Sequence, residues 1–220
     1  MDRQLDEEAA ALLRKAMEAR GIRFCLAART SAFEGAQRVE QIRTEDGRVL
    51  AADLVVVAAG ITPRTELARA CGLHCDRGIL VDDTLQTYDP SIYAVGECVQ
   101  HRGTTYGLVA PLWEQARVCA AHLAERGVTR YRGSQPASQL KVSGIDVFSA
   151  GDLTQLRSTE SIRFADPSAG IYKRLWLRDN RVLAAVLFGD TRAAAQLAEL
   201  IETQRDVSAV RETLLLGETA

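Results

Sequence analysis

The sequence predicts an α/β fold followed by a small α+β C-terminal domain. A continuous apolar run at 53–59 is typical of a parallel strand buried on both faces. After residue 138, several strand-like segments precede a single helical segment, which is typical of a separate α+β domain. Between the two parts, 133–138 is rich in small residues and forms the predicted linker.

The N-terminal segment predicts a helix over 6–20. Its apolar residues recur at helical spacing, and acidic residues occupy the first turn, where the helix dipole favours them. Gly21 is a typical helix stop. The alternation over 22–26 then predicts a strand.

A hairpin follows, because 38–44 and 48–50 flank the turn sequence Glu45-Asp46-Gly47. The apolar strand 53–59 ends at Gly60, and the proline three residues later marks an exit from a sheet.

The middle of the chain predicts a short helix at 65–71, strands at 78–82 and 91–95, and a long helix at 111–126. The long helix has a proline at its start and Gly127 after its end, which is the usual asymmetry. In the last part, Asp179-Asn180 forms a hairpin turn. The predicted elements there are strands at 140–150, 161–165, 172–177 and 181–188 and a helix at 193–203.

Composition excludes several classes of protein. The 220 residues are 47% hydrophobic and 25% charged, as in ordinary globular domains. A net charge of −2 gives no sign of a nucleic-acid partner, and no apolar run is long enough to span a membrane. The acidic N-terminus does not resemble a secretory signal, so a cytoplasmic location is the default expectation. The five cysteines show no metal-binding or disulfide spacing.

The strongest chemical signal is Gly96-Glu97, at the end of the apolar segment 91–95. Glycine allows a ligand to approach the backbone, and the carboxylate can accept hydrogen bonds from ribityl or ribose hydroxyls. A surface acid after a strand is the plain alternative. Ligands of open α/β sheets bind beyond the carboxyl ends of strands, which favours the binding interpretation.

The start of the long helix, at Pro111 and Leu112, adds to this signal. Free N–H groups and the positive end of the helix dipole would stabilise the anionic edge of a reduced flavin. A core helix with an ordinary first-turn proline is the alternative. The sequence contains neither Gly-x-Gly-x-x-Gly nor a P-loop, so no pyrophosphate loop is present, and no catalytic residue is assigned.

These motifs, in this order, resemble the FAD-dependent pyridine-nucleotide–disulfide oxidoreductases. The resemblance is greatest to the flavoprotein part of the NAD(P)H-nitrite reductase large subunit, and it covers essentially the whole chain. The segments that carry it are 3–6, 57–64, 92–98, 101–103, 106–112 and 140–145.

The resemblance implies a partial FAD/NAD(P)-binding, Rossmann-like, three-layer region. Residues 1–62 would be the C-terminal part of an NAD(P)-binding domain, and 63–132 the second segment of an FAD-binding domain. After the linker at 133–138, residues 139–220 would form the small C-terminal domain. The partners would be the missing N-terminal FAD/NAD half and downstream iron–sulfur and sirohaem modules.

The resemblance also implies roles for individual residues. Glu97 would hold the ribityl chain of FAD, Gly96 would allow its close approach, and Pro111 and Leu112 would place the helix start near the flavin pyrimidine edge. Gly60 would lie by the nucleotide junction. The wider family usually has Asp where Glu97 stands, so the extra methylene must be absorbed by a small shift. The redox cysteine pair of the disulfide reductases is absent.

The implied reaction of the parent is electron transfer from NAD(P)H through FAD to metal centres, in nitrate assimilation. The isolated chain is expected to be inactive, because it lacks pyrophosphate loops. A cofactor-free α/β scaffold or interaction module is the alternative. The surface left by a missing half-domain would be apolar and would favour a homodimer. The sequence leaves open the electron acceptor and the choice between NADH and NADPH.

Overall fold

The computed structural model describes residues 4–126, 128–134, 137–142, 144–156, 159–211 and 213–215. The chain divides into two compact units. The first unit comprises Met1–Ala32, Arg43–Val49 and Gln135–Ala220, and the second comprises Phe33–Ile42 and Leu50–Ser134. The expected helix stop at Gly127, and Gln135-Pro136 of the expected linker, lie outside the described residues. So do Arg3 and Ser143 of the segments that carry the resemblance.

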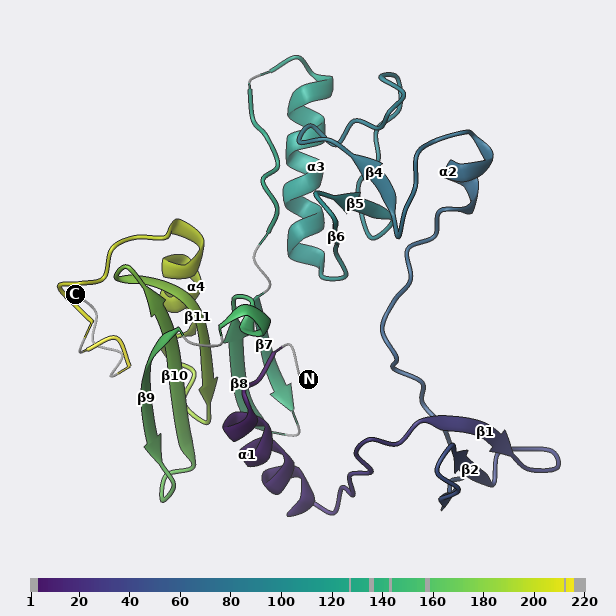
Figure 1. Cartoon of the computed structure of the whole chain (residues 1–220), viewed down its shortest axis with the longest axis vertical. Helices are drawn as coiled ribbons and strands as arrows, with labels where there is room; N and C mark the ends of the chain where they lie inside the picture. Colours follow the sequence, from purple (N-terminus) through teal and green to yellow (C-terminus); the bar gives the residue numbers. More distant parts are fainter. Residues whose placement is uncertain are drawn as a thin grey trace. The chain divides into compact units, whose positions relative to one another are not determined.

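The first unit is built on a five-stranded antiparallel sheet with the order β7-β8-β11-β10-β9 (Figure 1). Its strands are β7 (Ala137–Val142), β8 (Ile145–Ala150), β9 (Glu160–Asp166), β10 (Ile171–Arg178) and β11 (Arg181–Phe188). A short 3-10 helix, η1 (Leu153–Gln155), follows β8. Asp179 and Asn180 both have positive φ, 49° and 55°, as a tight hairpin turn requires, so the predicted turn is confirmed.

Helices cover both faces of this sheet because its strands are apolar on both sides. One face, with Leu175 and Leu187, packs against α4 (Ala194–Thr203). The other face, with Trp176 and Val186, packs against Leu13 and its neighbours on α1 (Glu7–Glu18). The predicted helices at 6–20 and 193–203 are thus confirmed, and together they close the core of the first unit.

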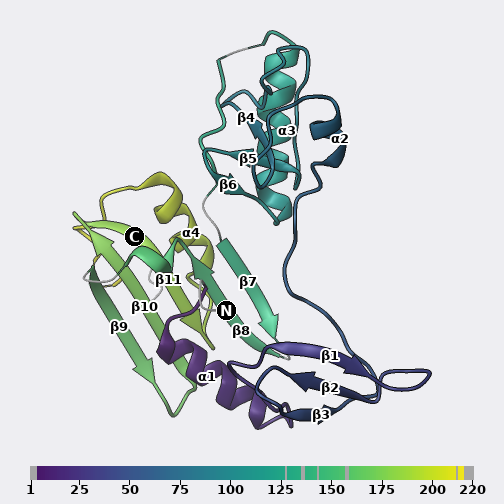
Figure 2. The ribbon, with the colours of Figure 1, turned by 45° about the vertical axis from the view of Figure 1, so that its right-hand side comes forward.

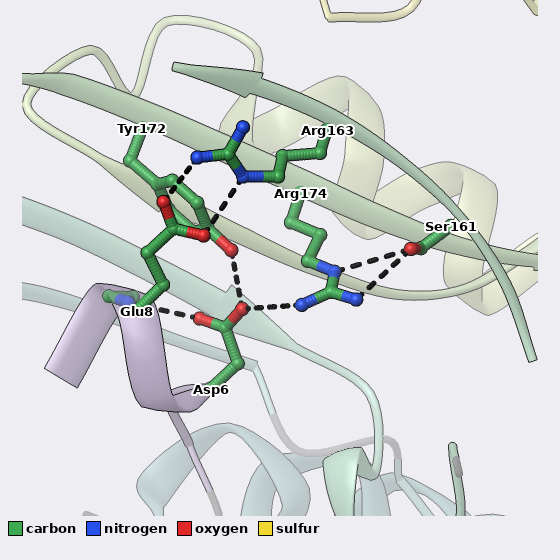
Figure 3. A network of polar contacts seen from close by, with 7 residues as sticks. Asp6, Glu8, Ser161, Arg163, Tyr172 and Arg174 are labelled. Atoms are coloured by element: carbon green, nitrogen blue, oxygen red, sulfur yellow. Dashed lines mark hydrogen bonds and ion pairs between the residues drawn. The ribbon is translucent and has the colours of Figure 1, made fainter. Parts of the chain in front are cut away.

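Polar contacts anchor the beginning of α1 to the same face of the sheet (Figure 3). Asp6 is the N-cap, and its Oδ1 accepts from the backbone N–H of Ala9 at 3.2 Å. Its Oδ2 accepts from the hydroxyl of Tyr172 and from Nη1 of Arg174, the latter at 3.1 Å. Glu8, two residues further along, pairs with Arg163 of β9.

A separate sheet has the order β1-β2-β3, visible in Figure 2. Its strands are β1 (Thr30–Glu34), β2 (Gln41–Thr44) and β3 (Val49–Ala51). The predicted hairpin is confirmed: Thr44 N–H donates to the carbonyl of Arg48 at 3.0 Å. β1 was not predicted, because its sequence shows little apolar alternation.

The second unit contains a small sheet in which β4 (Ile79–Val81) runs parallel to β5 (Val99–His101), and β6 (Thr104–Thr105) is antiparallel to β5. Its helices are α2 (Glu66–Ala70) and α3 (Val109–Leu123). The core is formed by Leu85, Val99, Tyr106, Val118, Cys119 and Tyr131. α3 begins two residues before the predicted start, so Pro111 lies in its first turn, where the missing N–H costs nothing.

Three predicted strands are absent. Residues 22–26 and 53–59 form no strand, and of 91–95 only Tyr93 makes an isolated bridge, to Gln86. At 22–26 and 53–59 the physical reason is the lack of neighbours: among the described residues no strand pairs along these segments, so most of their large apolar side chains are exposed. Residues 91–95 do have a neighbour, because the N–H of Ala94 donates to the carbonyl of Leu85 and the carbonyl of Ile92 accepts from the N–H of Thr87, but these contacts do not extend into a strand ladder. The predicted strand 140–150 was also wrong in extent, since the chain turns around Gly144 and forms β7 and β8.

Candidate functional site

The turn at Gly96-Glu97 lies in the second unit and is open on one side. Gly96 has φ of +106°, a conformation that favours glycine. No heavy atom lies within 4 Å of the position that a Cβ on Gly96 would occupy. The Glu97 side chain is exposed. A ligand can therefore approach both the backbone and the carboxylate here.

A hydrogen bond joins this turn to α3. The backbone N–H of Gly96 donates to Oε1 of Gln115 at 2.9 Å, and Gln115 is fully buried. Gln115 lies four residues after Pro111, which is about 6 Å along a helix. The structure thus brings Gly96 close to the first turns of α3, where Pro111 is buried and Leu112 is half-buried.

The N-terminus of α3 is available for a ligand. Leu108 occupies the N-cap position and provides no side-chain hydrogen bond to the free N–H groups of the first turn. The side chains of Leu108 and Val109 are exposed. Such an uncapped end presents N–H donors and a partial positive charge.

Gly60 lies in the same unit, on an exposed segment, with φ of +93°. Its neighbour Ile61 packs against the approach to α3: a Cβ on Gly107 would lie 2.6 Å from Cδ1 of Ile61. Gly60 and the start of α3 are therefore close together in the chain's second unit. Within the described part of the chain, Gly60 makes no direct contact with Gly96 or Glu97.

Gly60, the turn at Gly96-Glu97 and the start of α3 all lie in the second unit. Comparison with known proteins shows to which family the chain belongs. Residues 1–124, more than half of the chain, match the family described as pyridine nucleotide-disulphide oxidoreductase. The chain belongs to this family. Residues 136–205 match the rubredoxin NAD+ reductase C-terminal domain. The predicted fold class, an α/β nucleotide-binding region followed by a small α+β domain, is confirmed.

Two relatives from Bacillus subtilis (strain 168) match almost the whole chain. The assimilatory nitrate reductase electron transfer subunit is 43% identical over 100% of the chain. The NAD(P)H nitrite reductase is 45% identical over 98% of it. The chain spans only 28% and 27% of the lengths of these relatives.

Among solved structures, the covalent putidaredoxin reductase–putidaredoxin complex has a TM-score of 0.83 at 24% identity. The match covers 98% of this chain and 55% of that one. At this level of identity the likeness shows the fold alone, and the fold agrees with the family assignment.

The sequence patterns did not indicate a polar cluster around Asp83 in the second unit. His101 is buried in β5, with Nε2 2.9 Å from Oδ1 of Asp83. Arg102 donates to both oxygens of Asp83, at 2.9 and 2.6 Å. These hydrogen bonds, from Arg102 first and then His101, lower the pKa of Asp83 to about 2.

Among the described residues, no three His, Cys, Asp or Glu side chains are grouped as metal ligands. Within the same residues, no helix has the length and apolar character needed to cross a bilayer.

Proposed function

We propose that this chain is part of an FAD-dependent NAD(P)H oxidoreductase of the nitrite reductase kind, and that its second unit contributes the ribityl and isoalloxazine side of the FAD site. The hydrogen bond from Gly96 to Gln115 carries the proposal, because it joins the acid-bearing turn to the helix whose N-terminus is free. The names of the Bacillus subtilis relatives, an NAD(P)H nitrite reductase and an electron transfer subunit, support it.

The residues present fit a flavin. The exposed carboxylate of Glu97 can accept hydrogen bonds from ribityl hydroxyls, and the open space beside Gly96 gives the chain of the ligand room to approach. Pro111 and Leu112 would place the uncapped start of α3 toward the pyrimidine edge, where its N–H groups would favour negative charge. Gly60 lies at the junction of the nucleotide-binding segments.

Bound FAD would supply the chemistry of hydride acceptance and single-electron release, and the protein would orient and tune it. The chain's own part is to hold hydroxyls with Glu97 and to direct N–H donors from α3. No catalytic residue is proposed among these groups.

The parent domains are proposed as 1–62 (NAD(P)-binding), 63–132 (FAD-binding) and 139–220 (small C-terminal domain). These divide a longer protein, whereas the two compact units group segments by contact within this chain. An N-terminal FAD/NAD half and iron–sulfur and sirohaem modules are the proposed partners. Exposed apolar residues at 54–61 support packing against polypeptide outside this chain, since exposed apolar patches mark interaction surfaces.

Flavin titration of the purified chain tests the proposal. We expect FAD to co-elute with the chain in gel filtration, and Glu97→Gln to weaken FAD binding measured by fluorescence quenching. Glu66→Gln, at an exposed acid on α2 of the same unit, is the matched control and should bind as the wild type. A chain that binds no flavin would contradict the proposal and leave the cofactor-free scaffold or interaction module.

A further inference from the structure

Gln115 is completely buried, yet only the oxygen of its side-chain amide makes a hydrogen bond within the described part of the chain. Its Oε1 accepts from the N–H of Gly96, whereas its Nε2 has no hydrogen-bond partner within the described part of the chain. Buried polar atoms are nearly always paired, because an unpaired one loses its hydration without compensation. The free donor therefore requires an explanation.

A second glutamine in the same unit, Gln100, also accepts from a glycine N–H, but its amide nitrogen has a partner as well. Oε1 of Gln100 accepts from the N–H of Gly78 at 3.0 Å, and its Nε2 donates to Oδ2 of Asp76 at 3.0 Å. Gly78 is tightly enclosed, since a Cβ there would lie 2.9 Å from backbone atoms of β5. Both the oxygen and the nitrogen of the Gln100 amide therefore have hydrogen-bond partners, and this contact is purely structural.

The contact between Gln115 and Gly96 differs in both respects. Its donor is free, and the space beside Gly96 is open. The orientation of the amide follows from the hydrogen bond, because a flipped amide would set its NH2 group against the N–H of Gly96. Since Nε2 and Oε1 share one carbon atom, the free donor lies beside the turn that bears Glu97.

We propose that Gln115 is a ligand-positioning residue of the flavin site. Its carbonyl oxygen fixes the turn that presents Glu97, and its amide NH2 donates to a carbonyl or hydroxyl oxygen of the bound flavin, directly or through one water. The inference rests on the proposed function, because the flavin supplies the acceptor. Gln115 is absent from the residues that the sequence motifs singled out.

Riboflavin is the appropriate probe, because it has the isoalloxazine and ribityl groups but no pyrophosphate. Its fluorescence is titrated against the 220-residue chain, and amide hydrogen exchange of Gly96 is followed by NMR. We expect Gln115→Met to weaken riboflavin binding about 3- to 10-fold, as for one lost hydrogen bond, and to speed exchange at Gly96. Gln115→Glu keeps the acceptor for Gly96, so it should preserve protection there while still weakening binding.

Gln100→Met is the matched control, and it should speed exchange at Gly78 and leave riboflavin affinity within twofold. If Gln115→Met does not fold, Gln115→Glu carries the test. Wild-type riboflavin affinity in both Gln115 variants would overturn this inference and leave the proposed function standing. An equal loss in Gln100→Met would also overturn it, because the effect would then be general destabilisation. No binding of riboflavin or FAD by the wild type would overturn the proposed function, and this inference with it.

Discussion

Nζ of Lys173 donates a hydrogen bond to Oδ2 of Asp190 at 2.8 Å, and the lysine is buried while the aspartate side chain is 12% exposed. The ammonium also donates to the carbonyl of Leu215 at 3.0 Å. Arg192, at the surface, donates to both oxygens of Asp190 at 2.9 Å. These contacts, from Arg192 first and then Lys173, hold the pKa of Asp190 well below its usual range.

We predict that Asp190→Ala lowers the free energy of unfolding of the chain by about 3–5 kcal/mol, because it leaves the buried charge of Lys173 with a single carbonyl partner. Urea unfolding measures the effect. Arg192→Gln is the control: the arginine is 86% exposed, and its loss should cost about 1 kcal/mol or less. Equal losses in the two variants would contradict the prediction.

Asp6 gives a second prediction, because one carboxylate caps α1 and also binds Tyr172 and Arg174 of β10 (Figure 3). Asp6→Ala should cost about 1 kcal/mol for the cap, and a further 1–3 kcal/mol for the buried hydroxyl left without its acceptor. Thermal or urea unfolding measures the sum. Glu7→Ala, at an exposed neighbour, should change stability by no more than about 0.5 kcal/mol. A loss of only the cap value would show that the contacts to β10 contribute nothing.

Asp83 gives a pH-dependent prediction. Its pKa of about 2 in the folded chain is below the value of about 3.9 expected when unfolded. Folding therefore gains stability from this carboxylate above pH 4, and loses it as the pH falls from about 4 to 2. The difference in unfolding free energy between the wild type and Asp83→Asn should shrink over this range.

Asp83 also allows a test of what lowers its pKa. Because the hydrogen bond from Arg102 is the largest contribution, Arg102→Gln should raise the pKa of Asp83, measured from its carboxyl carbon by NMR titration. Arg77→Gln, at an exposed arginine that contacts the carbonyl of Gly103 instead, should leave that pKa unchanged. An unaltered pKa in Arg102→Gln would refute the assignment of the cause.

Local signals allowed much of the fold to be predicted. Asp6 followed by acids marked the start of α1, and Asp179-Asn180 marked the turn between β10 and β11. Each of these signals acts within a few residues, so sequence alone is sufficient. The strands predicted at 22–26, 53–59 and 91–95 are absent from the structure, because a strand requires a neighbouring strand and an apolar run does not indicate whether one is present.

In the candidate site, too, the local motifs could be predicted from the sequence and the contacts between distant residues could not. Gly96-Glu97 and the proline of α3 are local motifs and were found from the sequence. The residues that connect them were not: Gln115 is 19 positions from Gly96, and His101 is 18 from Asp83. A buried glutamine within an ordinary helical pattern carries no signal of such a contact, and only the folded chain reveals it.

The exposed segment that was predicted as a buried strand gives the last prediction. Val56 is 80% exposed, so Val56→Lys should change the unfolding free energy of the chain by no more than about 0.5 kcal/mol. It should also reduce self-association in sedimentation velocity, because it places a charge in an apolar patch. Val186→Thr, at a fully buried position of β11, is the contrasting variant and should cost about 1–3 kcal/mol. If Val56→Lys destabilised the chain as much as Val186→Thr, the segment would be a core strand, as the sequence pattern had indicated.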